Sequence, residues 1–322
     1  MKPLKYLFIS SMLFVATSCG NSWLDLEPST SVDTETSIKI LSDVEFTLNG
    51  IYSTMQSSDA YSGRLVYYGD VTGDDMQAVS STKRVANYYR FNFTKDDNPS
   101  SHWSYLYSII QNCNLILMNI DKLVIDEDDK AYRDDLKGEA LAIRGLALFD
   151  LTRIFGYPYL KDDGASLGVP IIEGLSTIDS KPTRNTVAQC YTKIIDDLTQ
   201  SLSLLGEKFN KGKINKWGAM VLLSRVYLYK GENANALKMA SDAITGAEKN
   251  KYALWTNEDY PTAWGEDASA SKPGEVLFEI VNLTTDSPGK ESMGYLNSYD
   301  GYDDMCITCS FYQFLKEDPK DI

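Results

Sequence analysis

The chain has 322 residues, which is enough for one large domain or two ordinary ones. Its 45 acidic and 31 basic residues give a formal net charge of -14 at pH 7. This charge argues against nucleic acid or anionic lipid headgroups as the main partner, because their phosphates would be repelled. The one histidine, His102, leaves little material for a metal site or a catalytic triad.

Residues 1–18 have the three parts of an export signal. Lysines open the segment, residues 7–16 form an apolar run too short to span a bilayer comfortably, and small residues precede Cys19. The pattern favours a bacterial lipoprotein signal in which the Cys19 thiol is acylated. An ordinary cleaved signal is the alternative. Acyl chains on Cys19 would anchor the protein without a spanning helix, and residues 19–33 would then form a polar tether.

Four stretches then show the apolar spacing of helices. They begin near Thr36, at Trp103, after the acidic run 126–129 and at Thr186, whose spacing to Gln189 predicts a capping box. The predicted apolar stripes are Leu41, Val44, Leu48, Ile51, Tyr52 and Met55; Leu106, Ile109, Ile110, Cys113, Leu117 and Ile120; Tyr132, Leu136, Ala140, Ile143, Ala147, Leu151 and Ile154; and Val187, Tyr191, Ile194, Leu198 and Leu202.

Residues 57–104 are predicted to be a loop inserted between the first two helices, since 57–63 break the first helix and 64–104 lack clear periodicity. A long loop inside a compact domain is usually functional. This one brings carboxylates, basic groups and aromatic rings together. The grouped carboxylates could bind Ca²⁺, but no D-x-D-x-D-G loop is present. The alternative interpretation is a surface loop whose Asp and Gly residues form turns.

Residues 216–245 predict two antiparallel helices joined at Gly231, which suits a left-handed helix end. The predicted facing stripes are Trp217, Met220, Val221, Ser224, Tyr227 and Leu228 on the first helix, and Ala236, Leu237, Ala240, Ala243 and Ile244 on the second. Small and large residues at these offsets resemble a tetratricopeptide (TPR) unit. One such unit cannot bury its own apolar face, so we expect others nearby.

After residue 250 the chain reads as a loop-rich region, 251–322, that is rich in aromatic residues. Residues 275–281 alternate enough to predict a short strand. Cys306 and Cys309 form a C-x-x-C pair, but neither a βαβ setting nor a second pair supports a redox or zinc site. A local disulfide or two free thiols is the expected state.

The order of several motifs resembles the SusD/RagB family of surface lipoproteins. The motifs are the Cys19 signal followed by Leu24-Asp25-Leu26-Glu27-Pro28; Asn49-Gly50-Ile51-Tyr52; Trp103-x-x-Leu106-Tyr107-x-x-Ile110 leading to Asn114; Glu139-Ala140-x-x-x-Arg144 through Arg153-x-Phe155-Gly156; Val187-x-x-Cys190-Tyr191 to Asp197-Leu198; Leu223-Ser224-Arg225-Val226-Tyr227-Leu228-Tyr229; and Glu275-Val276-Leu277-Phe278-Glu279-Ile280. Members of that family are usually longer, so this chain resembles a truncated member whose region 251–322 is incomplete.

The resemblance implies a mainly α fold: a TPR-like superhelix over residues 34–250, followed by a loop-rich, partly β region. It implies an outer-membrane lipoprotein that faces the cell exterior, binds an oligosaccharide or another nutrient, and docks on a SusC-like TonB-dependent transporter. It implies neither catalysis nor a cofactor. The ligand-binding candidates are Asp74, Asp75, Lys83, Arg84, Trp103, Trp264, Tyr295 and Tyr299.

Two other hypotheses remain open. The first is a TPR-like scaffold that docks on the transporter without binding a ligand. The second is an enzyme, such as a glycosidase that uses two carboxylates. Among 45 acidic residues suitable pairs arise by chance, and His102 has no companion motif that would activate a nucleophile. We therefore expect no catalytic site and no metal site.

Overall fold

The computed structural model describes residues 37–94, 100–177, 179–263, 274–283 and 285–318. The predicted signal, Cys19, the tether, Thr36 and Trp264 lie outside these residues. The chain divides into two units, residues 1–39 and 40–322. Residues 37–39 of the first unit contain neither helix nor strand. Every element named below belongs to the second unit.

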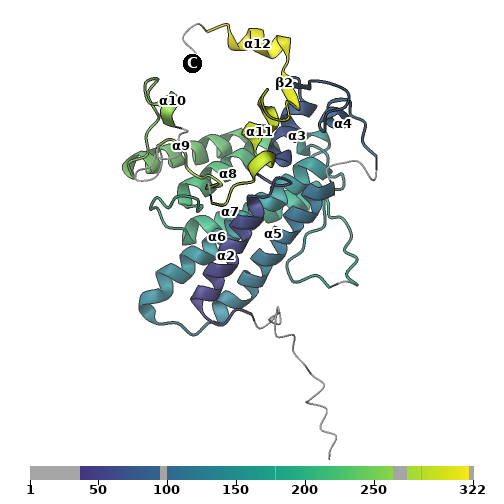
Figure 1. Cartoon of the computed structure of the whole chain (residues 1–322). Coiled ribbons are helices and arrows are strands. Elements are labelled where there is room, and N and C mark those ends of the chain that lie inside the picture. The colour runs from purple at the N-terminus through teal and green to yellow at the C-terminus, as the bar shows by residue number, and fades with distance from the viewer. Residues whose placement is uncertain (1–36, 95–99, 178, 264–273, 284, 319–322) are drawn as a thin grey trace, which may run out of the picture. The chain divides into compact units, whose positions relative to one another are not determined.

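Long helices dominate the second unit and pack in chain order, each against the next (Figure 1). They are α2 (Leu41–Met55), α5 (Ser100–Asn119), α6 (Lys130–Phe155), α7 (Val187–Leu204), α8 (Lys216–Lys230) and α9 (Asn233–Lys249). Successive packing of antiparallel helices is the arrangement of helical-repeat proteins. The structure therefore confirms the predicted mainly α, TPR-like fold.

α6 is the central helix, because its residues from Gly138 to Thr152 are all buried. Its contact with α7 is close: a Cβ at Gly145 would lie 3.0 Å from Cγ of Leu198. Most residues of the four predicted stripes are buried. Tyr132 is an exception at 41% exposed, and its hydroxyl donates a hydrogen bond to Glu45 instead. The predicted capping box of α7 is present between Thr186 and Gln189.

A buried polar network holds three of these helices together. The guanidinium of Arg144 (α6) donates to both carboxylate oxygens of Asp197 (α7), at 2.8 and 2.7 Å, and to Oδ1 of Asn114 (α5) at 2.8 Å. The amide of Asn114 in turn donates to the carbonyls of Ile172 and Gly174 in the α6–α7 connection. All three side chains belong to the ordered sequence motifs, so those motifs mark a structural core.

The α8–α9 hairpin forms as predicted, with Gly231 left-handed at φ 85°. Its predicted apolar faces are partly wrong. Leu228, Leu237 and Ile244 are 58%, 70% and 59% exposed. On α8 the predicted Trp217 is buried, and the other buried residues are Gly218, Ala219, Leu222, Leu223 and Val226, which were not predicted. The reason is that α8 also packs on α7, which selects a different face from the one that α9 alone would select.

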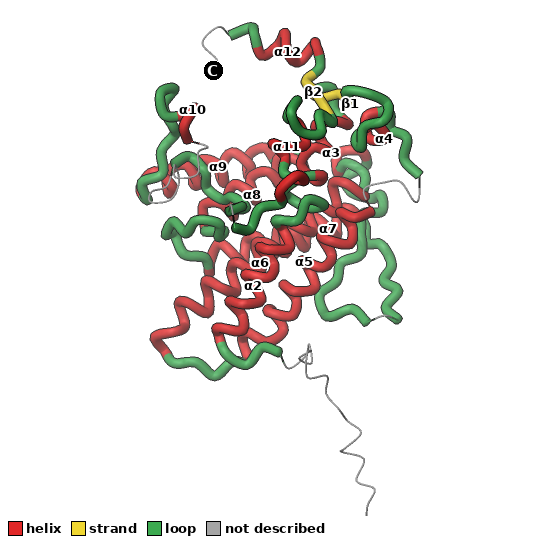
Figure 2. The backbone as a smooth tube through the Cα atoms, viewed as in Figure 1, coloured by secondary structure: helices red, strands yellow, loops and turns green. Residues whose placement is uncertain are grey.

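A small module sits beside the helices and combines two distant stretches of the chain (Figures 1 and 2). It contains α3 (Arg64–Thr72), β1 (Met76–Ala78), α4 (Ala86–Tyr89), η6 (Gly289–Glu291), α11 (Met293–Asn297) and β2 (Met305–Ile307). β1 and β2 are antiparallel, with Met76 opposite Ile307. Its apolar centre is Tyr67, Val71, Val85, Leu296 and Met305. We call it the small module below.

The small module corrects the expectation of an unstructured loop between residues 57 and 104. Its helices are too short to show periodicity over a sequence window, and their apolar partners come from residues 293–305. The predicted strand at 275–281 is also wrong, because these residues do not form a strand. The remaining short elements are η3 (Ile120–Lys122), η4 (Glu127–Asp129), η5 (Tyr159–Lys161), α10 (Tyr260–Ala263) and α12 (Cys309–Leu315).

Candidate functional site

Arg84 connects the two stretches of the small module. Its Nε donates to Oδ2 of Asp304 at 2.9 Å, and its Nη1 donates to the Glu291 carboxylate at 3.1 Å. Its guanidinium also lies 4.1 Å from the centre of the Tyr302 ring. Partial burial lowers the pKa of Arg84, but the carboxylates of Asp304 and Glu291 raise the pKa by more than burial lowers it. The net shift of the pKa is therefore upward. These contacts use most of the donors of Arg84, which makes it a positioning residue.

Lys83 and two tyrosines lie next to Arg84. Lys83 Nζ donates to the carbonyl of Tyr302 at 2.5 Å. The rings of Tyr295 and Tyr302 meet edge to face at 5.2 Å. Tyr299 lies in the turn between them, which is closed by the Tyr302 amide donating to the Tyr295 carbonyl, and it is 88% exposed. The structure therefore brings Lys83, Arg84, Tyr295 and Tyr299 together.

Asp74 and Asp75 belong to the same small module, just before β1. Their carbonyls accept hydrogen bonds from the Thr308 hydroxyl at 2.7 Å and the Thr308 amide at 2.9 Å. Both residues are exposed. Their carboxylates are therefore open to solvent while their backbone supports the end of the two-stranded sheet.

Trp103 lies apart from these residues, near the end of α6. Its ring contacts Tyr107 at 4.9 Å and Phe155 at 5.0 Å, and the Arg184 guanidinium lies 5.5 Å from its centre. It is half-buried. The structure therefore places Trp103 in a different environment from the other predicted site residues. Trp264 lies outside the described residues.

One aromatic group of the predicted loop was not among the ligand-binding candidates. Tyr88 and Phe93 lie 6.0 Å apart, and Phe91 packs edge to face on Phe93 at 6.3 Å. Phe91 is 64% exposed and has a positive φ of 54°. That conformation is unusual for a large side chain. The available sequence signal was the run of aromatic residues at 88–93, which has no helical or strand period.

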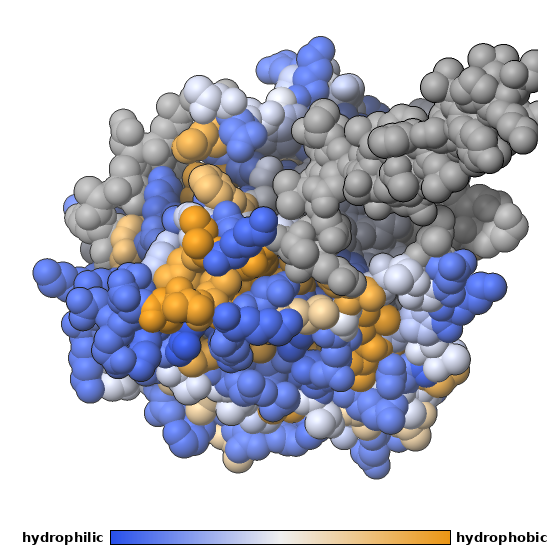
Figure 3. All heavy atoms as spheres, turned by 90° about the horizontal axis from the view of Figure 1, so that it is seen from below, coloured by the Kyte–Doolittle hydropathy of each residue, from blue (hydrophilic) through white to orange (hydrophobic). Residues whose placement is uncertain are grey.

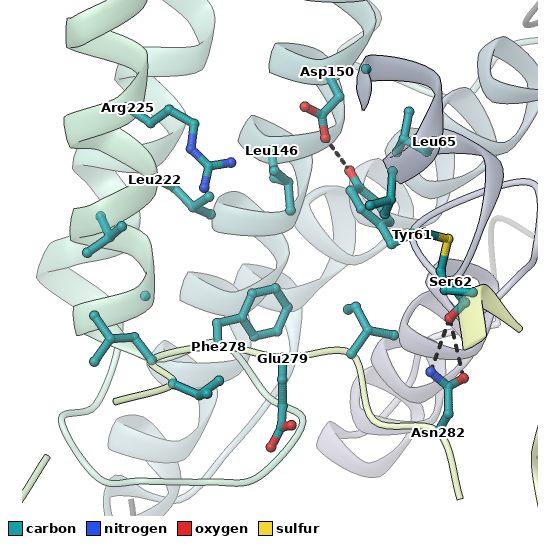
Figure 4. Close-up of a pocket in the computed structure, with 18 of the residues that line it drawn as sticks. Tyr61, Ser62, Leu65, Leu146, Asp150, Leu222, Arg225, Phe278, Glu279 and Asn282 are labelled. Carbon is teal, nitrogen blue, oxygen red and sulfur yellow. Dashed lines mark hydrogen bonds between the residues drawn. The ribbon is translucent and has the colours of Figure 1, made fainter. Parts of the chain in front are cut away.

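A cavity of about 1230 Å³ lies between α3, α6, α8 and residues 275–282 and 287–294 (Figure 4). Its wall is largely apolar and includes Leu65, Leu146, Leu222 and Phe278. Asp150, 3% exposed, accepts a hydrogen bond from the Tyr61 hydroxyl at 2.8 Å and pairs with Arg153. Burial, followed by the charge of Asp150, raises the pKa of Tyr61 well above its ordinary value. The polar groups at this edge of the cavity, Tyr61, Asp150 and Arg153, are therefore held by contacts with one another.

The other reactive side chains named from the sequence are two cysteines and one histidine. Cys306 and Cys309 are free thiols, one half-buried and one exposed. Nδ1 of the buried His102 lies at hydrogen-bond distance, 2.9 Å, from the Asp59 carbonyl, which accepts. Burial lowers the pKa of His102. Across the described ranges, no group of three or more His, Cys, Asp or Glu residues is placed to hold a metal ion.

None of the helices in the described part of the chain is long and apolar enough to cross a membrane. Figure 3 shows one face of the molecule, on which hydrophilic residues surround a continuous apolar patch and a second, smaller one. Surface apolar residues in small groups are normal for a folded protein.

A family model described as "Starch-binding associating with outer membrane", SusD-like, matches residues 22–228. Among curated proteins, SusD-like protein P2 of Formosa agariphila is 28% identical over 311 residues, which cover 94% of this chain and 57% of that protein. This chain therefore spans little more than half the length of that relative.

Solved structures also resemble this chain. A Bacteroides vulgatus protein, named as a candidate sugar binding protein, is 82% identical with a TM-score of 0.86, over 88% of this chain and 64% of that one. A SusD superfamily protein of Bacteroides thetaiotaomicron is 38% identical with a TM-score of 0.79, over 88% and 63%. With the family model matching well over half of its residues and the helical fold shared, this chain belongs to the SusD-like family.

Proposed function

We propose that this protein binds a glycan at the surface of the small module and passes it to a TonB-dependent transporter. The observation that carries the proposal is the exposed Tyr299 ring on the turn between Tyr295 and Tyr302, which Lys83 and Arg84 hold through their contacts with Tyr302. Aromatic rings hold the apolar faces of sugars, and charged or polar groups bond the hydroxyls. The name of the Bacteroides vulgatus relative supports a sugar as the ligand.

Each residue at this surface has a distinct role in the proposal. Tyr299 offers a free ring face, since it is 88% exposed. Arg84 fixes Tyr302 and the turn that carries Tyr299, through Asp304 and Glu291. The carboxylates of Asp74 and Asp75, on the same small module, would accept hydrogen bonds from sugar hydroxyls. The net charge of -14 favours a neutral glycan over an acidic one.

Replacing Tyr299 with alanine should weaken glycan binding about tenfold, or about 1.4 kcal/mol, because a stacking surface is removed. The measurement is isothermal titration of the full chain against the best polysaccharide from a broad binding screen. Tyr299→Ala should leave stability unchanged, since the side chain is exposed.

Tyr157→Ala is the matched control. Tyr157 is also a largely exposed tyrosine, 56% exposed, but it lies in the connection after α6. Its replacement should leave affinity unchanged. Equal affinities for the wild type and Tyr299→Ala would rule out this surface. Absence of binding to any polysaccharide by the folded chain would contradict glycan capture itself.

The family and the N-terminal sequence support a proposal about the membrane context. We propose that Cys19 carries the lipid anchor and that the protein faces the cell exterior at the outer membrane. The description of the matching family as associating with the outer membrane supports this. Cys19→Ser should move the protein from the membrane fraction to the soluble fraction of cells. Unchanged membrane association would exclude an anchor on Cys19.

A ligand-free scaffold is the second candidate. The exposed Leu237 and Ile244, seven residues apart on α9, favour it because they form an apolar stripe open to a partner. Recovery of a TonB-dependent transporter with the protein, together with no glycan binding, would favour the scaffold over glycan capture.

A further inference from the structure

His102 lies where the long helices meet the small module. It is fully buried near the start of α5 and is the one histidine in the sequence. Its Nδ1 lies 2.9 Å from the carbonyl of Asp59, in the turn that leads into α3. Its ring meets the ring of Tyr68 in α3 edge to face, at 6.0 Å between the ring centres. One side chain of α5 therefore contacts both the turn and the first helix of the small module.

The second ring nitrogen of His102 is buried without a partner. The Asp59 carbonyl can only accept a hydrogen bond, so Nδ1 carries the ring proton and Nε2 has a lone pair. Among the described residues, no group bonds Nε2. A proton on Nε2 would therefore add a positive charge and a second N–H donor at a buried position that offers no acceptor.

The charges around His102 do not favour its protonated form. The carboxylate of Asp59 pairs with Arg64, which also lies 4.0 Å from Glu291. Burial lowers the pKa of His102, the carbonyl and charge of Asp59 raise it, and the charge of Arg64 lowers it, with a net downward shift. Tyr68, which faces the ring from α3, stays neutral because burial raises its pKa. Among the described residues, α2 and α6, which pack on α5, add no charge that acts on His102.

Acid therefore favours release of this contact. The pKa of His102 in the folded protein lies below the ordinary value of 6.5. The stability that the neutral ring gives is fully present above about pH 6.5, and it is lost as the pH falls through the lower pKa of the folded state. A protonated ring that leaves the buried position gains water as a hydrogen-bond partner, but its contacts with Asp59 and Tyr68 are broken.

We propose that His102 is an acid-sensitive contact, which holds the turn at residues 57–63 and α3 against the helices at neutral pH and releases them in acid. The backbone of the turn is closed by local hydrogen bonds, such as that of the Arg64 amide to the Ser58 carbonyl at 2.7 Å. Exchange of these amides therefore reports whether the turn is held. Residues Gly138–Thr152 of α6 are buried independently of this contact, so the helices should stay folded.

The test is hydrogen exchange of the full 322-residue chain at pH 7 and pH 5, with the rates corrected for the intrinsic effect of pH. The expected result is at least tenfold less protection at pH 5 for the amides of residues 59–72, with unchanged protection in α6. Equal protection of residues 59–72 at the two pH values would overturn the proposal. An equal loss of protection in α6 would also overturn it, because that result means unfolding of the whole chain.

Two variants remove the titrating ring and keep part of its contacts. His102→Asn keeps a donor for the Asp59 carbonyl, and His102→Phe keeps a ring for Tyr68. Both should show less than a twofold difference in protection between pH 5 and pH 7, because neither side chain binds a proton in this range. Leu106→Met is the matched control, since Leu106 is also buried in α5, one turn further on, and the change removes no titrating group. It should keep the tenfold difference.

The ring itself can be followed by proton NMR, because the sequence has one histidine. The Cε1–H signal of His102 in the untagged chain should titrate with a midpoint below pH 6.5. A midpoint at or above 6.5, or a folded His102 variant that kept the tenfold difference, would assign the pH effect to other groups and overturn the proposal. Neither measurement uses a ligand, so failure of this proposal and failure of glycan binding are separate outcomes.

Discussion

Glu139 is a carboxyl group buried in the middle of α6, 3% exposed. It accepts a hydrogen bond from the Tyr52 hydroxyl at 2.6 Å, and Tyr52 accepts one from the Ile214 amide at 3.1 Å. Burial raises the pKa of Glu139 to about 7; Tyr52 and Lys213 lower it, and Asp135 and Glu45 raise it. Burial of this carboxyl, and not its hydrogen bond with Tyr52, is therefore what holds its pKa above the ordinary range.

This shift predicts a pH-dependent stability. The folded state binds the Glu139 proton more tightly than the unfolded chain, whose pKa is near the ordinary 4.5. The stability that proton binding at Glu139 gives to the folded state is therefore fully present below about pH 4.5. It is lost as the pH rises to about 7. It amounts to about 3 kcal/mol. Glu139→Gln should remove this loss, as measured by urea unfolding between pH 5 and 8.

Glu248→Gln serves as the control, since Glu248 is an exposed carboxylate on α9. It should keep the pH dependence of the wild type. If Glu139→Gln and the wild type lost equal stability between pH 5 and 8, the raised pKa of Glu139 would be wrong.

At the scale of elements, the α8–α9 hairpin shows how one contact sets the packing of two helices. Trp217 on α8 is 4% exposed, and its indole Nε1 donates to the Glu207 carbonyl at 3.1 Å. A Cβ built on Gly246 of α9 would lie 2.0 Å from Cζ3 of that ring. The indole is fixed by its hydrogen bond and its burial, so the absence of a side chain at residue 246 allows the close approach.

Gly246→Ala should therefore destabilise the protein by about 1–3 kcal/mol, although alanine favours helices. Gly50→Ala in α2 is the matched control, because no atom lies within 4 Å of a Cβ built there. That change should stabilise the protein by about 0.5–1 kcal/mol. The measurement is the free energy of unfolding of both variants. A Gly246→Ala protein as stable as Gly50→Ala would show that Trp217 can move aside.

At the scale of the second unit, the small module depends on contacts between residues more than 200 positions apart. Arg84 bridges to Glu291 and Asp304, and Ser62 bonds Asn282 at 3.3 Å. The proposed glycan surface exists only where these stretches meet. Asp304 is 5% exposed, so removal of Arg84 would take away the ion-pair partner of a buried carboxylate.

Arg84→Ala should loosen the small module without unfolding the helices. Amides of β1 and β2 should exchange about tenfold faster, while those of α6 should be unchanged, as measured by hydrogen exchange. Arg133→Ala is the control, because Arg133 pairs with the adjacent Asp134 within α6. Unchanged exchange in β1 and β2 would contradict a bridging role for Arg84.

The sequence by itself determined the long helices and their order. The stripes of α2, α5, α6 and α7, the capping box at Thr186 and the left-handed Gly231 all depend on residues close together in the chain. Such local patterns survive folding, because the same residues that favour a helix also bury its face. The ordered motifs also identified the family.

Only the tertiary structure decided which faces of α8 and α9 are buried, what residues 57–104 form and where the site residues meet. Leu237 and Ile244 have the spacing of a buried stripe, but the neighbours of the hairpin leave them exposed. Residues 275–281 have the composition of a strand, but a strand also needs a partner, and none is found in the described part of the chain. The turn that carries Tyr299 is held at Lys83 by a contact between residues more than 200 positions apart, which no local pattern encodes.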